Sequence, residues 1–531
     1  MKTTLREVVA ALMVPALCFA CQGDAISGDS MRNVVQIHSG LVRGKVEGRI
    51  NIFLGIPYAA PPIGELRWKP PQDVAPWDGV KDCKEFGPAC PQPERTEDSL
   101  CSEACLSLNV WSPAGKKGRK LPVMVWIHGG AFNFGATSQK EYDGKNLAKK
   151  GVVVVTLNYR LGPLGFFVHP LLSQESPEGT SGNYGLRDQI AALKWVRKNI
   201  AAFGGNPDMV TVFGQSAGSR SVGLLMISPL ATGLFHRAIA QSGGPIIGSE
   251  YLNPNFNGDM ANVSKMGERL AAKLGCDTSP DVLAALRAKS AQEIIEAAAC
   301  ATSVFDYGGL FFAPVFDGHV LPANPLSAYE NGNQHDVPII VGSTSDEGTV
   351  YLDGETDLSL ERYQSFLEAR FADEATKAFK VFPAPTAAAV PTAIDRLLTV
   401  GANAEPARLV AQCMERKNSP AYLYQFTRRP NTVLAQRLAV HHGVDLAYVF
   451  GNMKRSSGYN HVDRALSKKM MAYWVNFAKN GNPNGKGLPT WPPYRSEDDI
   501  NLEFADRVHT TQHLYKGECD FISEMLSRHW K

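Results

Sequence analysis

Short apolar runs alternate with a longer amphipathic stretch through the middle of the chain. The runs are VMVWI (123–127), GVVVVTLNY (151–159) and MVTVF (209–213), and a helical pattern, RDQIAALKWVRKNIAAF (187–203), precedes the last of them. Runs that are apolar at almost every position are typical of parallel strands buried on both faces. The pattern therefore predicts an α/β fold, in which helices cover both faces of a large, mostly parallel central sheet.

Two glycine-rich stretches follow these predicted strands directly. HGGAF (128–132) comes after the first strand, and GQSAG (214–218) comes after the last. Functional sites of parallel sheets form at the carboxyl ends of the strands, so both stretches are expected at the site. A glycine-rich turn offers unobstructed backbone N–H groups to a developing oxyanion, which suggests acyl transfer.

The serine within GQSAG, Ser216, needs its context to be meaningful. With 48 glycines in 531 residues, a G-x-S-x-G string arises by chance in roughly one such chain in four. A catalytic serine of this kind sits on a strained turn between a strand and a helix. MVTVF before the serine predicts the strand, and SRSVGLLMISP after it can form the helix, so the context favours a nucleophile.

Composition and charge narrow the class of protein. The chain is 44% hydrophobic and 20% charged, with a formal net charge of +2, which is ordinary for a globular protein and indicates no nucleic-acid partner. The one basic run, KKGRK (116–120), is interpreted as a solvated loop. No linker, internal repeat or composition break appears, so a single domain over residues 30–528 is expected.

The first residues form a separate unit. Lys2 and Arg6 precede the apolar stretch VVAALMVPALCFA, which has the length of a signal-peptide core and is too short to span a bilayer. We expect residues 1–21 to be a signal peptide, Cys21 to be a possible lipid-anchor site, and the protein to be secreted or periplasmic. No other segment is long and apolar enough for an integral membrane helix. The sequence gives no indication of the oligomeric state.

Eight cysteines remain after the expected leader, and in an oxidising compartment disulfides are the default. Four of them lie close together in the sequence and could in principle hold zinc: Cys83, Cys90, Cys101 and Cys105. Their irregular spacing lacks paired C-x-x-C motifs, so no metal is expected. GNPNGKG (481–487) resembles a phosphate-binding loop only superficially, because its glycine spacing is wrong and Gly487 replaces the required serine or threonine.

Several sequence blocks together resemble the type B carboxylesterases, a cholinesterase-like family of the α/β-hydrolase superfamily. The blocks follow one another in that family's order along nearly the whole chain after the leader: GIPYAAPPIGELRW, SEACLSLNVWSP, WIHGGAF, NYRLGPLGF, GNYGLRDQ, FGGNPDMVTVFGQSAG, SDEG, HHGVDLAYVFG and GNPNGKGLPTWPPY. The resemblance implies an α/β-hydrolase fold with helical insertions over the active site. It also implies a small-molecule ester substrate and no cofactor.

The resemblance assigns catalytic roles to three residues. Ser216 would be the nucleophile, Glu347 of SDEG the acid and His442 of HHG the base, in the chain order that this fold requires. The neighbouring Asp346 is the alternative acid, but the family's D-E-G block assigns the role to the second residue. The backbone N–H groups of three residues would form the oxyanion hole: Gly130, Ala131 and Ala217. Ala131 stands where many relatives carry a third glycine.

Four further residues are candidates for substrate contact: Gly129, Phe132, Arg220 and His441. His441 adjoins the base and is interpreted mainly as a structural or pocket-lining neighbour. Arg220 lies about one helical turn after Ser216, where relatives usually carry a small or apolar residue. Its guanidinium would either form a structural ion pair or hold a substrate carboxylate. If Arg220 holds a substrate carboxylate, the protein would be an esterase for polycarboxylic acid esters.

The resemblance also implies structural pairs. Two ion pairs are expected to pin loops to the sheet: Arg67 with Glu103, and Arg160 with Asp188. Four disulfides are expected: Cys90–Cys105 and Cys413–Cys519 match family bridges, Cys276–Cys300 replaces one whose usual partner position is Ala285, and Cys83–Cys101 is the remaining pair.

Some departures bear on specificity. Ala104 and Ser107 replace an acidic and an aromatic residue of the family block, which affects local loop contacts. The loop between Cys90 and Cys105 contains no aromatic residue, whereas cholinesterases hold their cationic substrate on a tryptophan there, so a choline-ester enzyme is not expected. Two alternatives to ester hydrolysis stay open: the same triad acting on thioesters, carbamates or amides, and a non-enzymatic binding protein of this fold.

Overall fold

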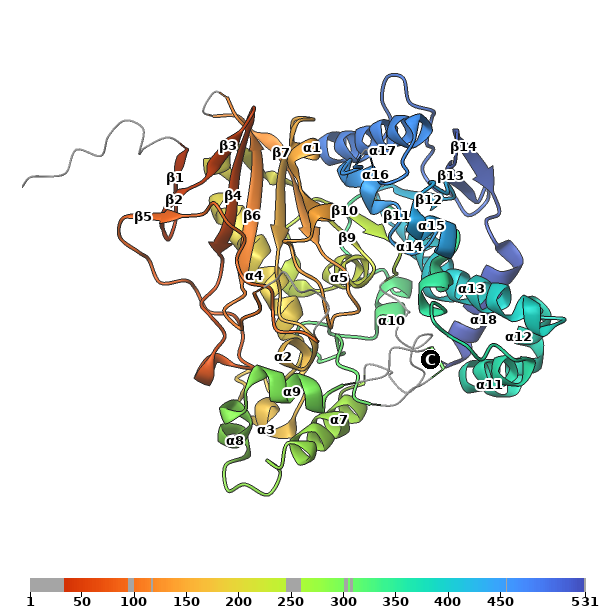
Figure 1. Cartoon of the computed structure of the whole chain (residues 1–531), viewed down its shortest axis with the longest axis horizontal. Helices are drawn as coiled ribbons and strands as arrows, with labels where there is room; N and C mark the ends of the chain where they lie inside the picture. Colours follow the sequence, from red (N-terminus) through yellow and green to blue (C-terminus); the bar gives the residue numbers. More distant parts are fainter. Residues whose placement is uncertain are drawn as a thin grey trace, which may run out of the picture.

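An eleven-stranded sheet forms the centre of the computed structural model, which describes residues 33–93, 100–115, 118–244, 259–299, 304–305, 309–454 and 456–529. Its strand order is β14-β13-β12-β11-β10-β9-β7-β8-β6-β4-β3, and β7 through β13 pair in parallel. In Figure 1 the sheet runs from the red and orange strands of the N-terminal part to the blue strands of the C-terminal part. The expected α/β-hydrolase architecture is confirmed.

The main-sheet strands are β3 (Lys45–Glu47), β4 (Ile50–Pro57), β6 (Ser107–Pro113), β7 (Leu121–Ile127), β8 (Val153–Leu157), β9 (Gly205–Gln215), β10 (Arg237–Gln241), β11 (Ile339–Thr344), β12 (Ala421–Phe426), β13 (Ile500–Phe504) and β14 (Val508–Gln512). A small second sheet contains β1 (Val34–Ile37), β2 (Gly40–Arg43) and β5 (Val80–Asp82). The three apolar runs of the sequence thus become β7, β8 and β9, which lie side by side.

The helices are α1 (Lys145–Ala148), α2 (Gly162–Phe166), α3 (Pro170–Glu175), α4 (Tyr184–Asn199), α5 (Ala217–Leu225), α7 (Met260–Lys273), α8 (Val282–Ala288), α9 (Ala291–Ala297), α10 (Pro325–Glu330), α11 (Leu360–Phe371), α12 (Ala375–Val381), α13 (Val390–Thr399), α14 (Glu405–Met414), α15 (Val433–Leu438), α16 (Leu446–Phe450), α17 (His461–Asn480) and α18 (Lys516–His529). Short 3-10 turns include η5 (Glu347–Tyr351), and a π-helical turn, η8 (Val400–Ala404), joins α13 to α14.

Side chains of β7 alternate between two cores. Val123 and Val125 face the core that includes residues of α4, α5 and α14, whereas Met124 and Trp126 face the core that includes residues of α1, α16 and α17. A strand whose successive side chains enter two apolar layers must be apolar at every position. This explains why the sequence shows an unbroken apolar run here.

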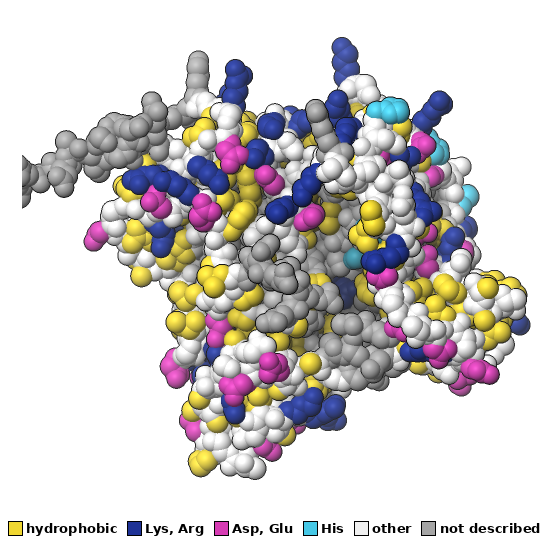
Figure 2. Space-filling view, viewed as in Figure 1, with side chains coloured by type: hydrophobic (Ala, Val, Ile, Leu, Met, Phe, Trp, Pro, Cys, Tyr) yellow, Lys and Arg dark blue, Asp and Glu magenta, His cyan; other side chains and the backbone are white. Residues whose placement is uncertain are grey.

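Both expected ion pairs are confirmed. Arg67 Nη2 lies 2.5 Å from Glu103 Oε1. Arg160 Nη2 and Nε donate to the two carboxylate oxygens of Asp188 at 2.7 and 2.8 Å, and both side chains are buried. On the face drawn in Figure 2, basic and acidic side chains are interspersed over the surface.

Candidate active site

Ser216 occupies a sharp turn between β9 and α5. Its backbone angles are φ 59° and ψ −126°, a conformation that costs energy for any residue with a side chain. The turn is fixed on both sides, because Ser216 N donates to Gln241 O at 3.0 Å and Ser216 O accepts from Arg220 N at 2.9 Å. The structure therefore has the strand, strained turn and helix that the sequence predicted around this serine.

The two glycines of GQSAG are required by close packing. A Cβ atom on Gly214 would lie 2.4 Å from the backbone of Gly218, and one on Gly218 would lie 2.0 Å from Ile127 O. Both distances are far shorter than any van der Waals contact. The motif is therefore explained by the close approach of β7, β9 and the start of α5, and is not a chance string.

Glu347 and His442 are in contact beside this turn. His442 Nδ1 lies 2.5 Å from Glu347 Oε2. Glu347 is fully buried at the start of η5, the next element after β11. Its other oxygen accepts from Thr344 N at 2.6 Å, and its own N–H donates to Thr399 Oγ1 at 2.9 Å. These bonds hold the carboxylate in one orientation against the imidazole.

The second ring nitrogen of His442 has an unexpected partner. Gln215 Nε2 lies 3.0 Å from His442 Nε2, whereas Ser216 Oγ hydrogen-bonds to no other residue that the structure describes. Sequence reasoning did not select Gln215. Its position directly before the serine was the only available signal.

The HGGAF loop lies against the serine turn because β7 and β9 are neighbours, with Ile127 opposite Gly214. A Cβ atom on Gly129 would lie 2.9 Å from Ser216 Cβ. Gly130 and Ala131 have φ values of 114° and 51°, and within the described ranges neither of their N–H groups donates a hydrogen bond. Ala217 is the first residue of α5, where the N–H has no acceptor inside the helix.

His128 supports this loop. Its Nδ1 lies 2.8 Å from Gly129 O, and its ring stacks on Tyr159 with centroids 4.5 Å apart. Burial lowers the pKa of His128 to about 4, so the ring is neutral at working pH and Nδ1 donates. Because Gly129 O and Gly130 N belong to one peptide unit, this bond also orients the Gly130 N–H.

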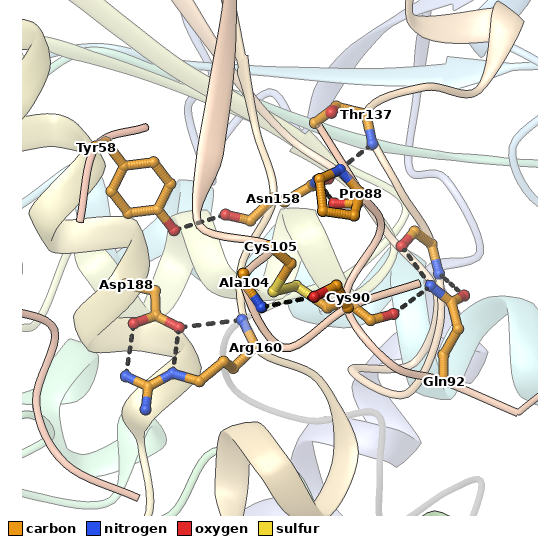
Figure 3. The surroundings of a disulfide bond; sticks show 12 residues. Tyr58, Pro88, Cys90, Gln92, Ala104, Cys105, Thr137, Asn158, Arg160 and Asp188 are labelled. Atoms are coloured by element: carbon orange, nitrogen blue, oxygen red, sulfur yellow. Dashed lines mark hydrogen bonds and ion pairs between the residues drawn. A yellow bond between two sulfur atoms is a disulfide. The ribbon is translucent and has the colours of Figure 1, made fainter. Parts of the chain in front are cut away.

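The Cys90–Cys105 disulfide is confirmed, and Figure 3 shows it together with Gln92 and Asn158. Gln92 Oε1 accepts from Gly135 N at 2.8 Å, and Gln92 Nε2 donates to Gly135 O at 3.1 Å. Asn158, at the end of β8, accepts from Thr137 N at 2.9 Å and donates to Pro88 O at 3.0 Å. The disulfide segment is therefore bonded directly to the loop that follows HGGAF.

Two expected disulfides are wrong in this structure. Cys413 and Cys519 are buried thiols: Cys413 Sγ accepts from Arg416 at 3.4 Å, and Cys519 Sγ donates to Leu514 O at 3.6 Å, so each sulfur has another partner. Cys83 is likewise a buried thiol, so the Cys83–Cys101 bridge is not formed. Cys300 lies outside the described residues, and Cys276–Cys300 stays a prediction.

The other candidates differ in their surroundings. His441 is 8% exposed, its Nδ1 contacts His442 O at 3.0 Å, and burial lowers its pKa. Phe132 is 1% exposed and packs on Phe166 with ring centroids 5.2 Å apart, so its side chain belongs to the core and is not exposed to solvent. The Asp346 carboxylate accepts from Val440 N at 3.1 Å, whereas the contact with His442 Nδ1 is made by Glu347.

Arg220 lies near a residue that the sequence analysis missed, Tyr351. Burial and, to a lesser extent, the charge of Glu347 raise the pKa of the Tyr351 phenol, the positive charge of Arg220 opposes them, and the net result is a pKa of about 12. The Tyr351 ring centroid lies 6.2 Å from that of His442. The guanidinium, the phenol and the imidazole therefore belong to one region of the protein.

Two further acids, the buried Asp445 and the half-buried Asp395, interact electrostatically with Glu347. Asp445 Oδ2 accepts from Gln241 at 3.0 Å, and burial raises the pKa of Asp445 to about 6. Asp395 Oδ1 accepts from Gly348 N at 2.7 Å, and burial followed by the charge of Asp346 raises the pKa of Asp395 to about 7. Among the described residues, no group of three or more His, Cys, Asp or Glu side chains is placed to hold a metal ion.

The sequence model of the Carboxylesterase family matches residues 31–522. The chain belongs to this carboxylesterase family. It is 38% identical to the fumonisin B1 esterase of Sphingopyxis macrogoltabida, with 92% of this chain and 89% of that protein covered. It is 36% identical to the para-nitrobenzyl esterase of Bacillus subtilis (strain 168), with 91% and 99% covered.

A solved structure of a PNB esterase has the same fold as this carboxylesterase, with a TM-score of 0.79 and 33% sequence identity over 92% of this chain and 99% of that one. The family membership establishes ester hydrolysis as the class of reaction. The expected leader and Cys21 lie outside the described residues. No helix in the described ranges is both long and apolar enough to cross a membrane.

Proposed function

We propose that the protein hydrolyses carboxylic esters through an acyl-enzyme on Ser216. His442 would take the Ser216 proton as Oγ attacks the ester carbonyl and would return it to the departing alcohol. Water would then attack the acyl-enzyme by the same route. The contact of His442 Nδ1 with Glu347 Oε2 at 2.5 Å, beside the strained serine turn, carries this proposal. The N–H groups of Gly130, Ala131 and Ala217 would hold the oxyanion.

The test uses purified enzyme and a p-nitrophenyl ester. Ser216→Ala is expected to lower kcat by several orders of magnitude while leaving the melting temperature close to that of the wild type. Covalent labelling by a fluorophosphonate should occur in the wild type and be absent in the variant. Near-normal turnover or labelling in Ser216→Ala would overturn the serine mechanism.

For the substrate, we propose esters that carry a second, free carboxylate held by Arg220. The nearness of Arg220 to Tyr351, and of Tyr351 to His442, supports this choice, since a cation and a neutral phenol donor both suit a carboxylate. Ser216 would then attack the neighbouring ester carbonyl while the charge of the substrate fixes its orientation. The similar fumonisin B1 esterase is one ester hydrolase whose activity can be compared directly.

A pH-stat assay with two esters of similar size, the acidic monoethyl succinate and the neutral ethyl pentanoate, tests whether Arg220 binds a substrate carboxylate or has only a structural role. Arg220→Met is expected to lower kcat/KM for the acidic ester by about tenfold or more and to leave the neutral ester nearly unchanged. Arg187→Met is a matched control, because Arg187 is also a helical arginine but pairs with Glu178 and contacts no residue of the proposed triad. Equal losses on both esters, or no wild-type preference for the acidic ester, would exclude this substrate class.

We further propose export to an oxidising compartment. The apolar leader after Lys2 and Arg6 and the Cys90–Cys105 bridge support it. N-terminal sequencing of the protein from its native host tests cleavage near residue 21, and an intact Met1 would contradict it.

A further inference from the structure

The side-chain amide of Gln215 is hydrogen-bonded to His442 Nε2, the ring nitrogen that the proposed mechanism needs as proton acceptor. Gln215 is 5% exposed and ends β9, and its Nε2 lies 3.0 Å from His442 Nε2. The mechanism requires this same nitrogen to accept the Ser216 proton. A neutral imidazole nitrogen has one lone pair, so it accepts one good hydrogen bond at a time.

The protonation state of the pair follows from the other ring nitrogen. Nδ1 faces the Glu347 carboxylate at 2.5 Å and must therefore carry a proton. In the neutral ring Nε2 is then the acceptor, so the Gln215 amide presents N–H and not its oxygen. The bond thus fixes the tautomer in which His442 is ready to act as a base.

The space around the amide is shaped by two glycines. A Cβ atom on Gly129 would lie 3.2 Å from Gln215 Oε1, and one on Gly443 would lie 3.5 Å from Gln215 Nε2. A side chain at 129 would also collide with Ser216 Cβ at 2.9 Å. The amide therefore lies between the loop of the oxyanion hole and the loop that carries the base.

We propose that Gln215 is a positioning residue for the base: in the resting enzyme its amide holds His442 Nε2, and this bond is exchanged for the bond from Ser216 when substrate binds. The inference rests on the proposed Ser216–Glu347–His442 mechanism. The bond favours the neutral ring, because an imidazolium would turn its own N–H toward the amide N–H. Other titratable groups near the ring are Glu347, Asp445, His441 and Tyr351.

Two substitutions of similar size test the proposal through the pH profile and kcat. Gln215→Glu replaces the donor with a carboxylate that favours the imidazolium, so the acidic midpoint of the kcat/KM profile should rise by about one pH unit. Gln215→Met removes the bond without adding charge, so kcat should fall about tenfold with little change in KM and no rise in the midpoint.

Gln189→Glu and Gln189→Met are the matched controls. Gln189 is also a buried glutamine, but its amide donates to Ser221 Oγ at 3.0 Å and does not contact the base. These controls should keep the wild-type pH midpoint. An unshifted midpoint in Gln215→Glu, or wild-type kcat in Gln215→Met, overturns the proposal. Failure of the serine mechanism itself would appear separately, as retained turnover in Ser216→Ala.

Discussion

Gln92 and Gly135 exchange two hydrogen bonds, at 2.8 and 3.1 Å, and so join the disulfide segment to the loop of the proposed oxyanion hole. Gln92 is two residues from Cys90, whose bridge to Cys105 closes a span of 15 residues. A disulfide restricts the unfolded chain, and here it also limits how far Gln92 can move from Gly135. The bridge can therefore affect both stability and catalysis.

The double variant Cys90→Ser, Cys105→Ser is expected to lose about 3 kcal/mol of unfolding free energy, the usual value for a loop of this length. It should also show a lower kcat well below its melting temperature, because Gln92 is less firmly held. Urea unfolding and p-nitrophenyl ester turnover measure the two effects. A control, Cys83→Ser, removes a buried thiol that forms no bridge and should leave kcat unchanged.

The same cysteines can be mapped directly. Alkylation of unreduced, denatured protein followed by peptide analysis should recover Cys90 and Cys105 as one linked peptide pair. Cys83, Cys413 and Cys519 should be recovered as alkylated thiols. A Cys413–Cys519 peptide would show that the family bridge forms after all.

His128→Phe tests how the oxyanion loop is held. Phenylalanine can keep the stack on Tyr159, but it cannot donate to Gly129 O. Losing one such bond should lower kcat about tenfold with little change in KM, because the Gly130 N–H acts on the charge of the transition state. Initial rates of ester hydrolysis at substrate concentrations from below KM to saturation measure both kcat and KM. A higher KM with an unchanged kcat would mean that the His128–Gly129 bond does not act on the charge of the transition state.

The pH dependence of the wild type should report His442. A base must be neutral to accept the Ser216 proton, so kcat/KM should fall as the solution is made more acidic. Burial lowers the pKa of both His128 and His441, so neither of these rings is expected to set the acid limb. The acid limb should persist in His128→Phe, and a rate that stays flat down to pH 4 would contradict the assignment of the base.

The sequence identified the strands that carry the site, because parallel strands buried on both faces appear as uninterrupted runs of apolar residues. β7, β8 and β9 lie where VMVWI, GVVVVTLNY and MVTVF predicted them. The contact of Glu347 with His442 could be expected only through the resemblance, since 95 positions separate them along the chain. Neither residue type nor spacing alone selects one acid among Asp346, Glu347 and Asp445.

The contacts that the sequence did not reveal are made by neutral or common side chains. Gln215, Gln92 and Thr399 act through hydrogen bonds whose partners are known only once the chain has folded. The wrong Cys413–Cys519 pairing has a similar origin. Matching the family's positions says that two sulfurs can be neighbours, but rotamers and competing partners decide whether they bond.

Asp395 provides a test of the electrostatics around Glu347. Its pKa is about 7 in the folded protein, above the value of 3.8 for an unfolded aspartate, because it is buried and faces Asp346 and Glu347. The folded state therefore binds its proton more tightly than the unfolded state. This contribution to stability is complete below about pH 4 and is lost as the pH rises through 7.

Asp395→Asn keeps an oxygen to accept from Gly348 N but cannot ionise. The melting temperature of the variant, measured relative to the wild type, should therefore rise as the pH increases from 5 to 8. Asp463→Asn is a control of opposite sign, since the pKa of Asp463 is lowered with help from Arg428; it should be destabilised, with a constant difference over the same pH range. A difference for Asp395→Asn that does not change between pH 5 and 8 would mean that its carboxylate is already ionised at pH 5 in the folded protein.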